Sequence, residues 1–147
     1  QLLSRYSQFY RKEVTLLRGN WEFLIGVTYS RIYKGFGSYL TGTDMLLRYN
    51  LVQPDSRVVP YIQLGVGAVL TDAYKDQSQS AIGQALEFTP QGSVGFRYHI
   101  NPTWSFDVEG MYHHISNARL AKRNDGINAW GAFFGVSYSP DWRRFGP

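Results

Sequence analysis

The sequence contains no cysteine and no long apolar segment. Without cysteine, disulfide bonds and thiol catalysis are excluded. A membrane-spanning helix needs about 18 to 20 consecutive apolar residues, and no run of that length occurs, although hydrophobic residues make up 44% of the chain and aromatic residues 16%. Nor does any segment show a convincing helical period of apolar residues. Two classes remain, a soluble globule or a membrane β-barrel, whose alternating strands do not stand out in hydropathy.

The 147 residues carry a net charge of +4, with the basic residues scattered along the chain. That length is enough for one domain, and the scattered charge argues against a nucleic-acid partner. No signal peptide is visible at Gln1, as expected for a mature form whose export signal has been removed. We expect a single domain over residues 1–147, with an N-terminal segment (1–18) that lacks clear alternation and a polar C-terminal tail (139–147).

Alternation of apolar and polar residues predicts strands from Trp21 onward, because successive side chains of a strand point to opposite faces. Six strands joined by turns and loops are clear, and they read as an antiparallel meander. They cover approximately residues 21–30, 44–51, 60–70, 86–98, 104–116 and 128–138. Pro90 and Gly92 predict a bulge or bend in the fourth of them.

The two faces of these strands differ sharply. One face carries large apolar residues, including Leu64, Val66, Phe106, Val108, Trp130 and Phe134. The other mixes small and polar residues with charges, including Gln63, Glu87, Arg97, Asp107 and Glu109. Because aromatic residues also gather near strand ends, as in the girdles of membrane barrels, we predict that the apolar face points outward to lipid. The alternative is a soluble lipocalin-like barrel with an apolar interior.

The predicted fold class is therefore all-β, an antiparallel up-and-down transmembrane β-barrel of about eight strands. Bacterial barrels have an even number of strands, with eight as the minimum. Either the N-terminal segment supplies the strands beyond the six, or the chain lacks its first one or two. Inside the barrel we expect His113 to join a polar network with Glu109 or Asp107.

Three polar residues lie on the apolar face, where polar side chains without a function are not expected. His114 and Ser116 end the strand 104–116, and Asn128 begins the next strand. Residues i and i+2 of a strand share a face and are roughly 6 to 7 Å apart at the backbone. A histidine at this spacing can reach a serine hydroxyl and take its proton. By itself a His-x-Ser pair is common by chance, so the surrounding sequence must indicate whether this pair has a catalytic role.

That surrounding sequence resembles a known family. The runs His114-Ile115-Ser116-Asn117-Ala118 and Asn124-Asp125-Gly126-Ile127-Asn128 resemble the C-terminal signature of the PagL family of outer-membrane lipid A 3-O-deacylases. Upstream segments, such as Pro60 to Gly67, are similar in order and spacing, so the resemblance spans roughly residues 20 to 138. It implies an eight-stranded barrel that hydrolyses the ester-linked acyl chain at the 3-position of lipid A, without a metal or other cofactor.

The resemblance also implies roles for these residues. Ser116 matches the nucleophile and His114 the base of the family's Ser-His-Glu triad, but the glutamate falls at Asn128. An asparagine can accept a hydrogen bond and fix the histidine tautomer, yet it supplies no negative charge. We therefore expect either weakened catalysis or another partner for His114. Asn124 matches a residue that helps to stabilise the oxyanion, with Asn117 as support for the site.

The loop between the two strands adds a basic cluster. Arg119, Lys122 and Arg123 are expected to bind lipid A phosphates by charge-assisted hydrogen bonds, unless they form only a solvated loop. In bacterial barrels long loops face outward and short turns face the periplasm. The long 117–126 loop and the short Asn101-Pro102 turn thus place His114 and Ser116 at the outer leaflet, which lipid A occupies.

We predict an esterase embedded in the bacterial outer membrane that acts on lipid A or lipopolysaccharide of the outer leaflet. The alternative is a catalytically weak or inactive barrel of the same fold that serves as a structural or accessory subunit of an outer-membrane assembly. A homodimer or a place in a larger complex is compatible with the sequence.

Overall fold

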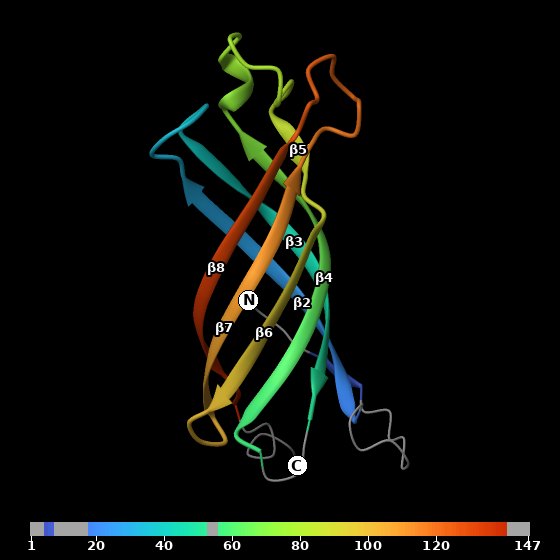
Figure 1. The fold of residues 1–147 in the computed structure, drawn as a ribbon, viewed down its shortest axis with the longest axis vertical. Helices are drawn as coiled ribbons and strands as arrows, with labels where there is room; N and C mark the ends of the chain where they lie inside the picture. The colour runs from blue at the N-terminus through green and yellow to red at the C-terminus, as the bar shows by residue number, and fades with distance from the viewer. Residues whose placement is uncertain (1–4, 8–17, 53–55, 141–147) are drawn as a thin grey trace.

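The computed structural model describes residues 5–7, 18–52 and 56–140. Its regular elements are eight strands and one short 3-10 helix (Figure 1). They are β1 (Arg5–Ser7), β2 (Gly19–Arg31), β3 (Tyr39–Leu51), β4 (Val58–Thr71), η2 (Ala73–Lys75), β5 (Leu86–Phe88), β6 (Gln91–His99), β7 (Trp104–Ile115) and β8 (Ile127–Tyr138). No helix among the described residues is long and apolar enough to cross a membrane.

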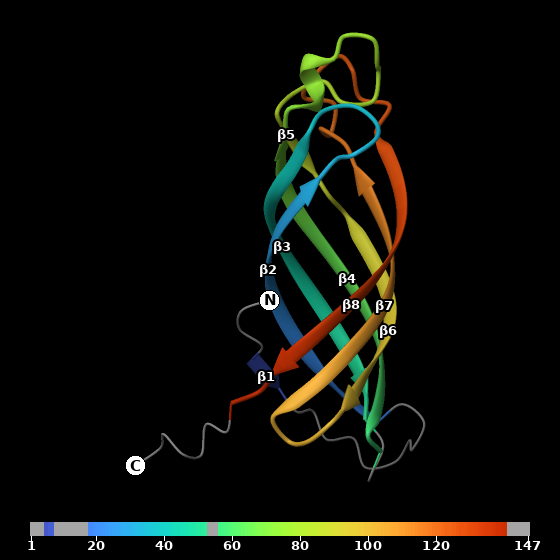
Figure 2. The ribbon, with the colours of Figure 1, turned by 90° about the vertical axis from the view of Figure 1, so that its left-hand side faces the viewer.

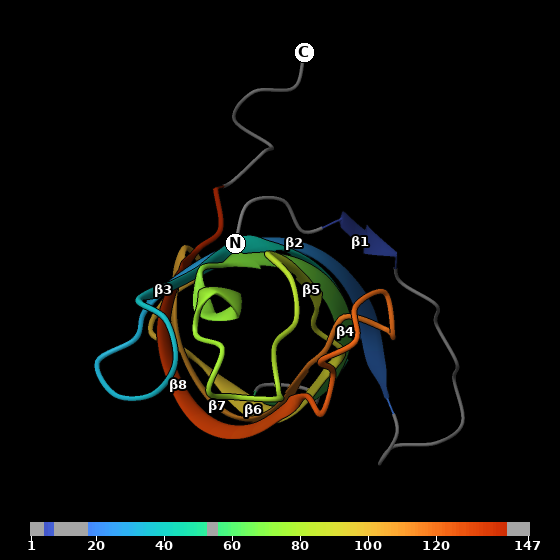
Figure 3. The ribbon, with the colours of Figure 1, turned by 90° about the horizontal axis from the view of Figure 1, so that it is seen from above.

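All eight strands belong to one antiparallel sheet in the order β1-β2-β3-β4-β6-β7-β8, with β5 paired to β4. Apart from β5 and β6, which both pair with β4, consecutive strands are paired with each other, and the sheet curls around a common axis, as the view along that axis shows (Figure 3). The strands are tilted against this axis (Figure 2). The prediction of an all-β up-and-down barrel of about eight strands is confirmed.

The six strands expected from alternation correspond to β2, β3, β4, β5 with β6, β7 and β8. The interruption between β5 and β6 is confirmed at Thr89 and Pro90. β3 starts earlier than predicted, at Tyr39, because this residue pairs with Arg31 at the end of β2. Of the N-terminal segment, β1 pairs with β2, and the tail 141–147 lies outside the described residues.

The orientation of the two faces is confirmed. The outer face is exposed and apolar, with Leu64 71% exposed, Trp130 83% and Phe134 72%, while Phe106 and Val108 on the same face are half-buried. The inner face is polar and buried: Glu87 is fully buried, and Gln63, Arg97 and Glu109 are nearly so. An apolar exterior around a charged interior is the reverse of a soluble barrel.

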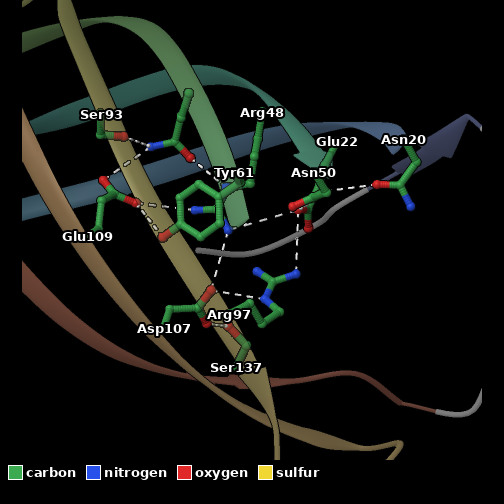
Figure 4. A network of polar contacts seen from close by, with 11 residues as sticks. Asn20, Glu22, Arg48, Asn50, Tyr61, Ser93, Arg97, Asp107, Glu109 and Ser137 are labelled. Carbon is green, nitrogen blue, oxygen red and sulfur yellow. Dashed lines mark hydrogen bonds and ion pairs between the residues drawn. The ribbon is translucent and has the colours of Figure 1, made fainter. Parts of the chain in front are cut away.

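Paired charges lie on the inner face in the half of the barrel where β2 begins and β3 ends, and Figure 4 shows them from close by. The guanidinium of Arg48 donates to Gln63 Oε1 at 2.8 Å and lies 3.8 Å from the ring centre of Tyr61. Its ion pairs reach Glu109 and Asp107, both at 3.5 Å. Burying such charges is costly unless each is paired and hydrogen-bonded, and the Tyr61 hydroxyl meets this need by donating to Glu109 at 2.8 Å.

A second arginine extends the same network. Arg97 donates to Asp107 at 2.9 Å and forms an ion pair with Glu22 at 3.6 Å (Figure 4). The other Asp107 oxygen accepts from the Ser137 hydroxyl of β8 at 2.6 Å. The network thus joins β2, β3, β4, β6, β7 and β8 across the interior, and side chains rather than open space occupy the barrel at this level.

His113 does not join this network. Its Nε2 atom is buried without a hydrogen-bond partner, so the expected contact with Glu109 or Asp107 is wrong. The reason is distance along the strand. His113 and Glu109 face the same side, but they lie four positions apart along β7, which is roughly 13 Å.

An apolar cluster lies at the ends of β4 and β7, at the end of the barrel where the long loops gather (Figure 1). Val69 of β4, Ala73 of η2, Ile82 of the following loop and Ile115 of β7 form its buried core. Ile82 is only 1% exposed. Because this cluster packs the 72–85 loop over the end of β7, it fixes the place where the candidate functional residues stand.

Candidate active site

The register of β7 and β8 brings the predicted residues together. His114 pairs with Asn128, and Tyr112 pairs with Trp130, two residues closer to the middle of the two strands. Directly opposed residues of an antiparallel pair have Cβ atoms roughly 4.5 to 5.5 Å apart and share a face. All four side chains therefore lie on the outer surface near the upper end of the barrel.

His114 and Asn128 are in direct contact. The Nδ1 atom of His114 lies 2.7 Å from Asn128 Oδ1. The same oxygen accepts a hydrogen bond from the Tyr112 hydroxyl at 2.8 Å. If Nδ1 carries the imidazole proton, it donates to Asn128, and Nε2 keeps a lone pair with which it can accept a proton.

Tyr112 was not singled out from the sequence. Alternation along the strand places Tyr112 on the same face as His114, but its contact with Asn128 depends on the register between β7 and β8. Its ring packs on Trp130, with centroids 4.9 Å apart and planes tilted by 56°. This cross-strand aromatic pair holds the Tyr112 hydroxyl beside Asn128.

Ser116 stands one residue past the end of β7, held by its backbone. Its N–H donates to the Phe88 carbonyl at 3.0 Å, and its carbonyl accepts from the Phe88 N–H at 2.7 Å. His114 is tied to the same edge through its N–H, which donates to the Pro90 carbonyl at 3.0 Å. The interrupted β5–β6 segment thus positions both residues.

In the described part of the chain no hydrogen bond joins the Ser116 hydroxyl to the His114 ring. Catalytic hydrogen bonds are often long in free enzymes and tighten when substrate binds. The spacing along the strand allows this approach, since the two residues lie two positions apart at the end of one strand.

Gly126 lies against the other edge of the imidazole. A Cβ atom at this position would stand 2.9 Å from His114 Cε1 and 3.4 Å from Nε2, and the backbone is left-handed, with φ +74°. Both facts favour glycine here. Gly126 belongs to the Asn-Asp-Gly run of the sequence, where it reads as a turn residue, and only the structure shows its contact with His114.

The 116–126 loop is organised around Asn117, which is fully buried. Its N–H donates to Asn124 Oδ1 at 2.7 Å, and its side-chain amide donates to the Arg123 carbonyl at 2.8 Å. The contact with Asn117 orients the Asn124 amide through its oxygen and leaves its NH₂ as the group that can donate to an anion.

Asn117 also starts a tight turn. Leu120 N–H donates to the Asn117 carbonyl at 3.0 Å, and the two residues between them, Ala118 and Arg119, are both left-handed, with φ 52° and 68°. Positive φ at both central positions defines a type I′ turn. Because neither residue is glycine, the backbone here stores strain. The strained turn begins two residues after Ser116.

The three basic residues of the loop have different surroundings. Arg123 donates to three backbone carbonyls of the neighbouring loop, those of Tyr74 at 2.6 Å, Asp76 at 2.7 Å and Gln79 at 2.9 Å. Arg119 and Lys122 are exposed. Binding of phosphate by all three stays a prediction, but the guanidinium of Arg123 already bridges the two upper loops.

Further contacts connect these two loops. Asp125 N–H donates to the Ser80 carbonyl at 3.2 Å, and Gly126 N–H donates to the Ala81 carbonyl at 3.1 Å. The Ser80 hydroxyl also bonds the Asp125 carboxylate. The 72–85 loop is therefore the support on which the site loop rests. Within the described ranges, no group of three or more His, Asp or Glu residues is placed to hold a metal ion.

Comparison with known proteins gives one match. The family model described as lipid A 3-O-deacylase (PagL) matches residues 5–137. No curated protein and no solved structure matches the chain.

Proposed function

This chain belongs to the lipid A 3-O-deacylase (PagL) family, and we propose that it is an esterase of the bacterial outer membrane that removes an ester-linked acyl chain from lipid A. Ser116 is the nucleophile, His114 the base and Asn128 the residue that orients the base. The observation that carries this proposal is the 2.7 Å contact between His114 Nδ1 and Asn128 Oδ1 on the outer face, two residues from Ser116.

The reaction follows the general scheme of serine esterases. The Ser116 oxygen attacks the ester carbonyl while His114 Nε2 takes the hydroxyl proton. The tetrahedral intermediate then expels the sugar hydroxyl, which leaves with the proton that His114 returns. A water molecule, activated in the same way, releases the fatty acid from the acyl-enzyme. Asn124 supports the oxyanion of each intermediate through its amide N–H groups.

Substrate reaches this site from the membrane rather than through the barrel. The interior is occupied by paired charges below and by the apolar cluster around Ile82 above. Around the site the outer surface is apolar and exposed, as at Trp130 and Phe134. An acyl chain in the outer leaflet can lie along such a surface, with its ester bond level with the upper end of β7.

Arg119 and Lys122 favour an anionic headgroup. Both are exposed on the loop that carries the site. Charge-assisted hydrogen bonds to phosphate are stronger than neutral ones, and lipid A carries phosphates. These residues would hold the headgroup while the ester bond lies at Ser116. Arg123 contributes to the same function by holding the loop against Tyr74, Asp76 and Gln79.

A second function is favoured by one observation. Position 128 carries an asparagine, where the resemblance to the family implies a glutamate, and an amide cannot supply the negative charge that stabilises a protonated imidazole. A barrel with weak or no activity would then serve as a structural or accessory subunit of an outer-membrane assembly, as a homodimer or in a larger complex.

The deciding experiment incubates the purified protein with lipid A in detergent and follows the lipid by mass spectrometry. We expect loss of one hydroxyacyl chain with the unaltered protein and none with Ser116→Ala. Ser139→Ala, one residue past the end of β8 that is far from the site, is the matched control and should retain activity. An inert but correctly folded protein would contradict the esterase and favour the accessory subunit.

A further inference from the structure

We propose that Tyr112 is a positioning residue that fixes the orientation of the Asn128 amide, and through it the tautomer of His114. The inference deepens the proposed esterase function and rests on it for its kinetic consequences. Its starting point is that two hydrogen bonds converge on one atom, since Asn128 Oδ1 meets His114 Nδ1 at 2.7 Å and the Tyr112 hydroxyl at 2.8 Å.

An asparagine in place of a carboxylate creates an ambiguity that a carboxylate lacks. Both oxygens of a carboxylate accept hydrogen bonds, whereas an amide presents either an acceptor oxygen or a donor NH₂. With the oxygen toward His114, the imidazole proton sits on Nδ1 and Nε2 is free to act as base. With the NH₂ toward His114, Nδ1 must accept, the proton sits on Nε2, and the base is lost. Activity therefore depends on the direction of the Asn128 amide.

The Tyr112 hydroxyl favours the productive direction. It donates its proton to Asn128 Oδ1 in the observed arrangement. If the amide turned over, the Tyr112 oxygen could accept from the NH₂ group, but its own proton would lose its acceptor. On an outer surface in contact with lipid, few water molecules are available to replace that acceptor. A hydroxyl hydrogen without a hydrogen-bond partner then costs free energy. This asymmetry keeps the oxygen of Asn128 toward both partners.

Two neighbouring features hold Tyr112 in position for this role. Its ring packs on Trp130, with centroids 4.9 Å apart, and it stands two residues from His114 on the same face of β7. Trp104 and Tyr138, at the other end of the same two strands, form a pair of the same geometry, with centroids 4.9 Å apart and planes tilted by 56°. The second pair lies far from the site and so provides a matched control.

The kinetic test compares Tyr112→Phe with Tyr138→Phe, each in the unaltered protein and in Asn128→Asp. Removing the Tyr112 hydroxyl should lower kcat on lipid A on the order of tenfold or more, with little change in KM, since the wrong tautomer disables the base. In the Asn128→Asp background the loss should be much smaller, because a carboxylate accepts in either direction. Tyr138→Phe should leave kcat unchanged. An equal loss in both backgrounds would show a merely structural role and overturn the inference.

A spectroscopic test is independent of activity. In protein labelled with ¹⁵N histidine and held in detergent micelles, NMR reports which nitrogen of His114 carries the proton. We expect the Nδ1–H form in the unaltered protein and a shift toward the Nε2–H form in Tyr112→Phe. The same tautomer in both proteins would overturn the inference. If the protein is inert on lipid A but the tautomer shifts as expected, the esterase function fails while the positioning role of Tyr112 stands.

Discussion

The Nδ1 atom of His114 lies 2.7 Å from Oδ1 of Asn128, its direct partner across the β7–β8 ladder. A carboxylate at this place would both orient the imidazole and stabilise its protonated form. An amide oxygen does only the first. The contact that would orient the imidazole is thus present in this chain, while the negative charge is missing.

Adding a carboxylate at position 128 should raise the activity. Asn128→Asp keeps the shape of the side chain, and Asn128→Glu introduces the residue of the family. Because a hydrogen bond to a charged acceptor is stronger by about 1 to 2 kcal/mol than one to a neutral acceptor, we expect kcat to rise about tenfold. The measurement is the rate of acyl release from lipid A.

Ser116→Ala serves as the control in each of these backgrounds and should abolish hydrolysis. If the unaltered protein and Asn128→Glu are both inert while the barrel is folded, the catalytic hypothesis fails and the accessory-subunit function is preferred.

Gly126→Ala should disable the site more than it destabilises the fold. The new methyl group would stand 2.9 Å from His114 Cε1 and push the imidazole aside. Misplacement of a catalytic group by about 1 Å can cost a hundredfold in rate, so we expect a loss of kcat of that order. The measurements are kcat and the thermal unfolding midpoint in micelles.

Gly35→Ala is the matched control for backbone strain. Gly35 also has a positive φ, +126°, but among the described residues a Cβ atom there would meet only the Ile32 side chain, at 3.9 Å. Both variants should lower stability, since left-handed backbone disfavours a side chain, and only Gly126→Ala should lower kcat. Equal kcat in the two variants would remove Gly126 from the site.

Reversing the exposed charges of the site loop should weaken substrate capture without altering the chemistry. For Arg119→Glu with Lys122→Glu, we expect weaker binding to phosphorylated lipid A, most of all at low salt, because screening shortens electrostatic reach to about 10 Å at 0.1 M salt. Binding to lipid A micelles is measured at several salt concentrations.

Arg57→Glu is the control, because Arg57 is exposed at the end of the barrel with the short turns. It changes the net charge by the same amount per residue, far from the site loop. Unchanged binding in the double variant would leave Arg119 and Lys122 as part of a solvated loop.

The Asp72 carboxylate connects two upper loops in a way that depends on pH. It accepts hydrogen bonds from the Ser38 hydroxyl and from the N–H groups of Ser38 at 2.7 Å and Tyr39 at 3.3 Å. These bonds, above all those from Ser38, lower the pKa of Asp72 from 3.8 to about 2. Because the pKa of Asp72 is lowered in the folded state, the ionised carboxylate stabilises the fold at neutral pH. This stabilisation is lost as the pH falls from near 4 toward 2.

NMR titration of the Asp72 carboxyl group should therefore give a midpoint near the folded value, and Ser38→Ala should raise it toward the ordinary range. Asp72→Asn should speed amide hydrogen exchange at Ser38 and Tyr39 at neutral pH, where the carboxylate acts. A titration midpoint that Ser38→Ala does not move would contradict the assigned cause.

Strand positions and the direction of each face follow from local sequence, which explains why they were predicted well. Alternation of Leu64 and Val66 with Gln63, or of Phe106 and Val108 with Asp107, is a property of a single strand and needs no knowledge of its neighbours. His114 and Ser116 could be placed on the outer face by the same rule. Partners could not be assigned in that way, and His113 shows the limit, since its shared parity with Glu109 did not bring the two side chains together.

The amino-acid sequence by itself determined an all-β barrel with an apolar exterior, a charged interior and a His-x-Ser pair on the outer face. Only the tertiary structure decided which groups meet: Asn128 with His114, Tyr112 with Asn128, Gly126 with the imidazole, and Arg123 with the carbonyls of the 72–85 loop. The physical reason is that the face to which a side chain points depends only on the alternation within its own strand. Which side chains touch each other depends on the register between strands and on loops that pack over one another. Those are set by the whole barrel, through pairings between residues far apart in the chain.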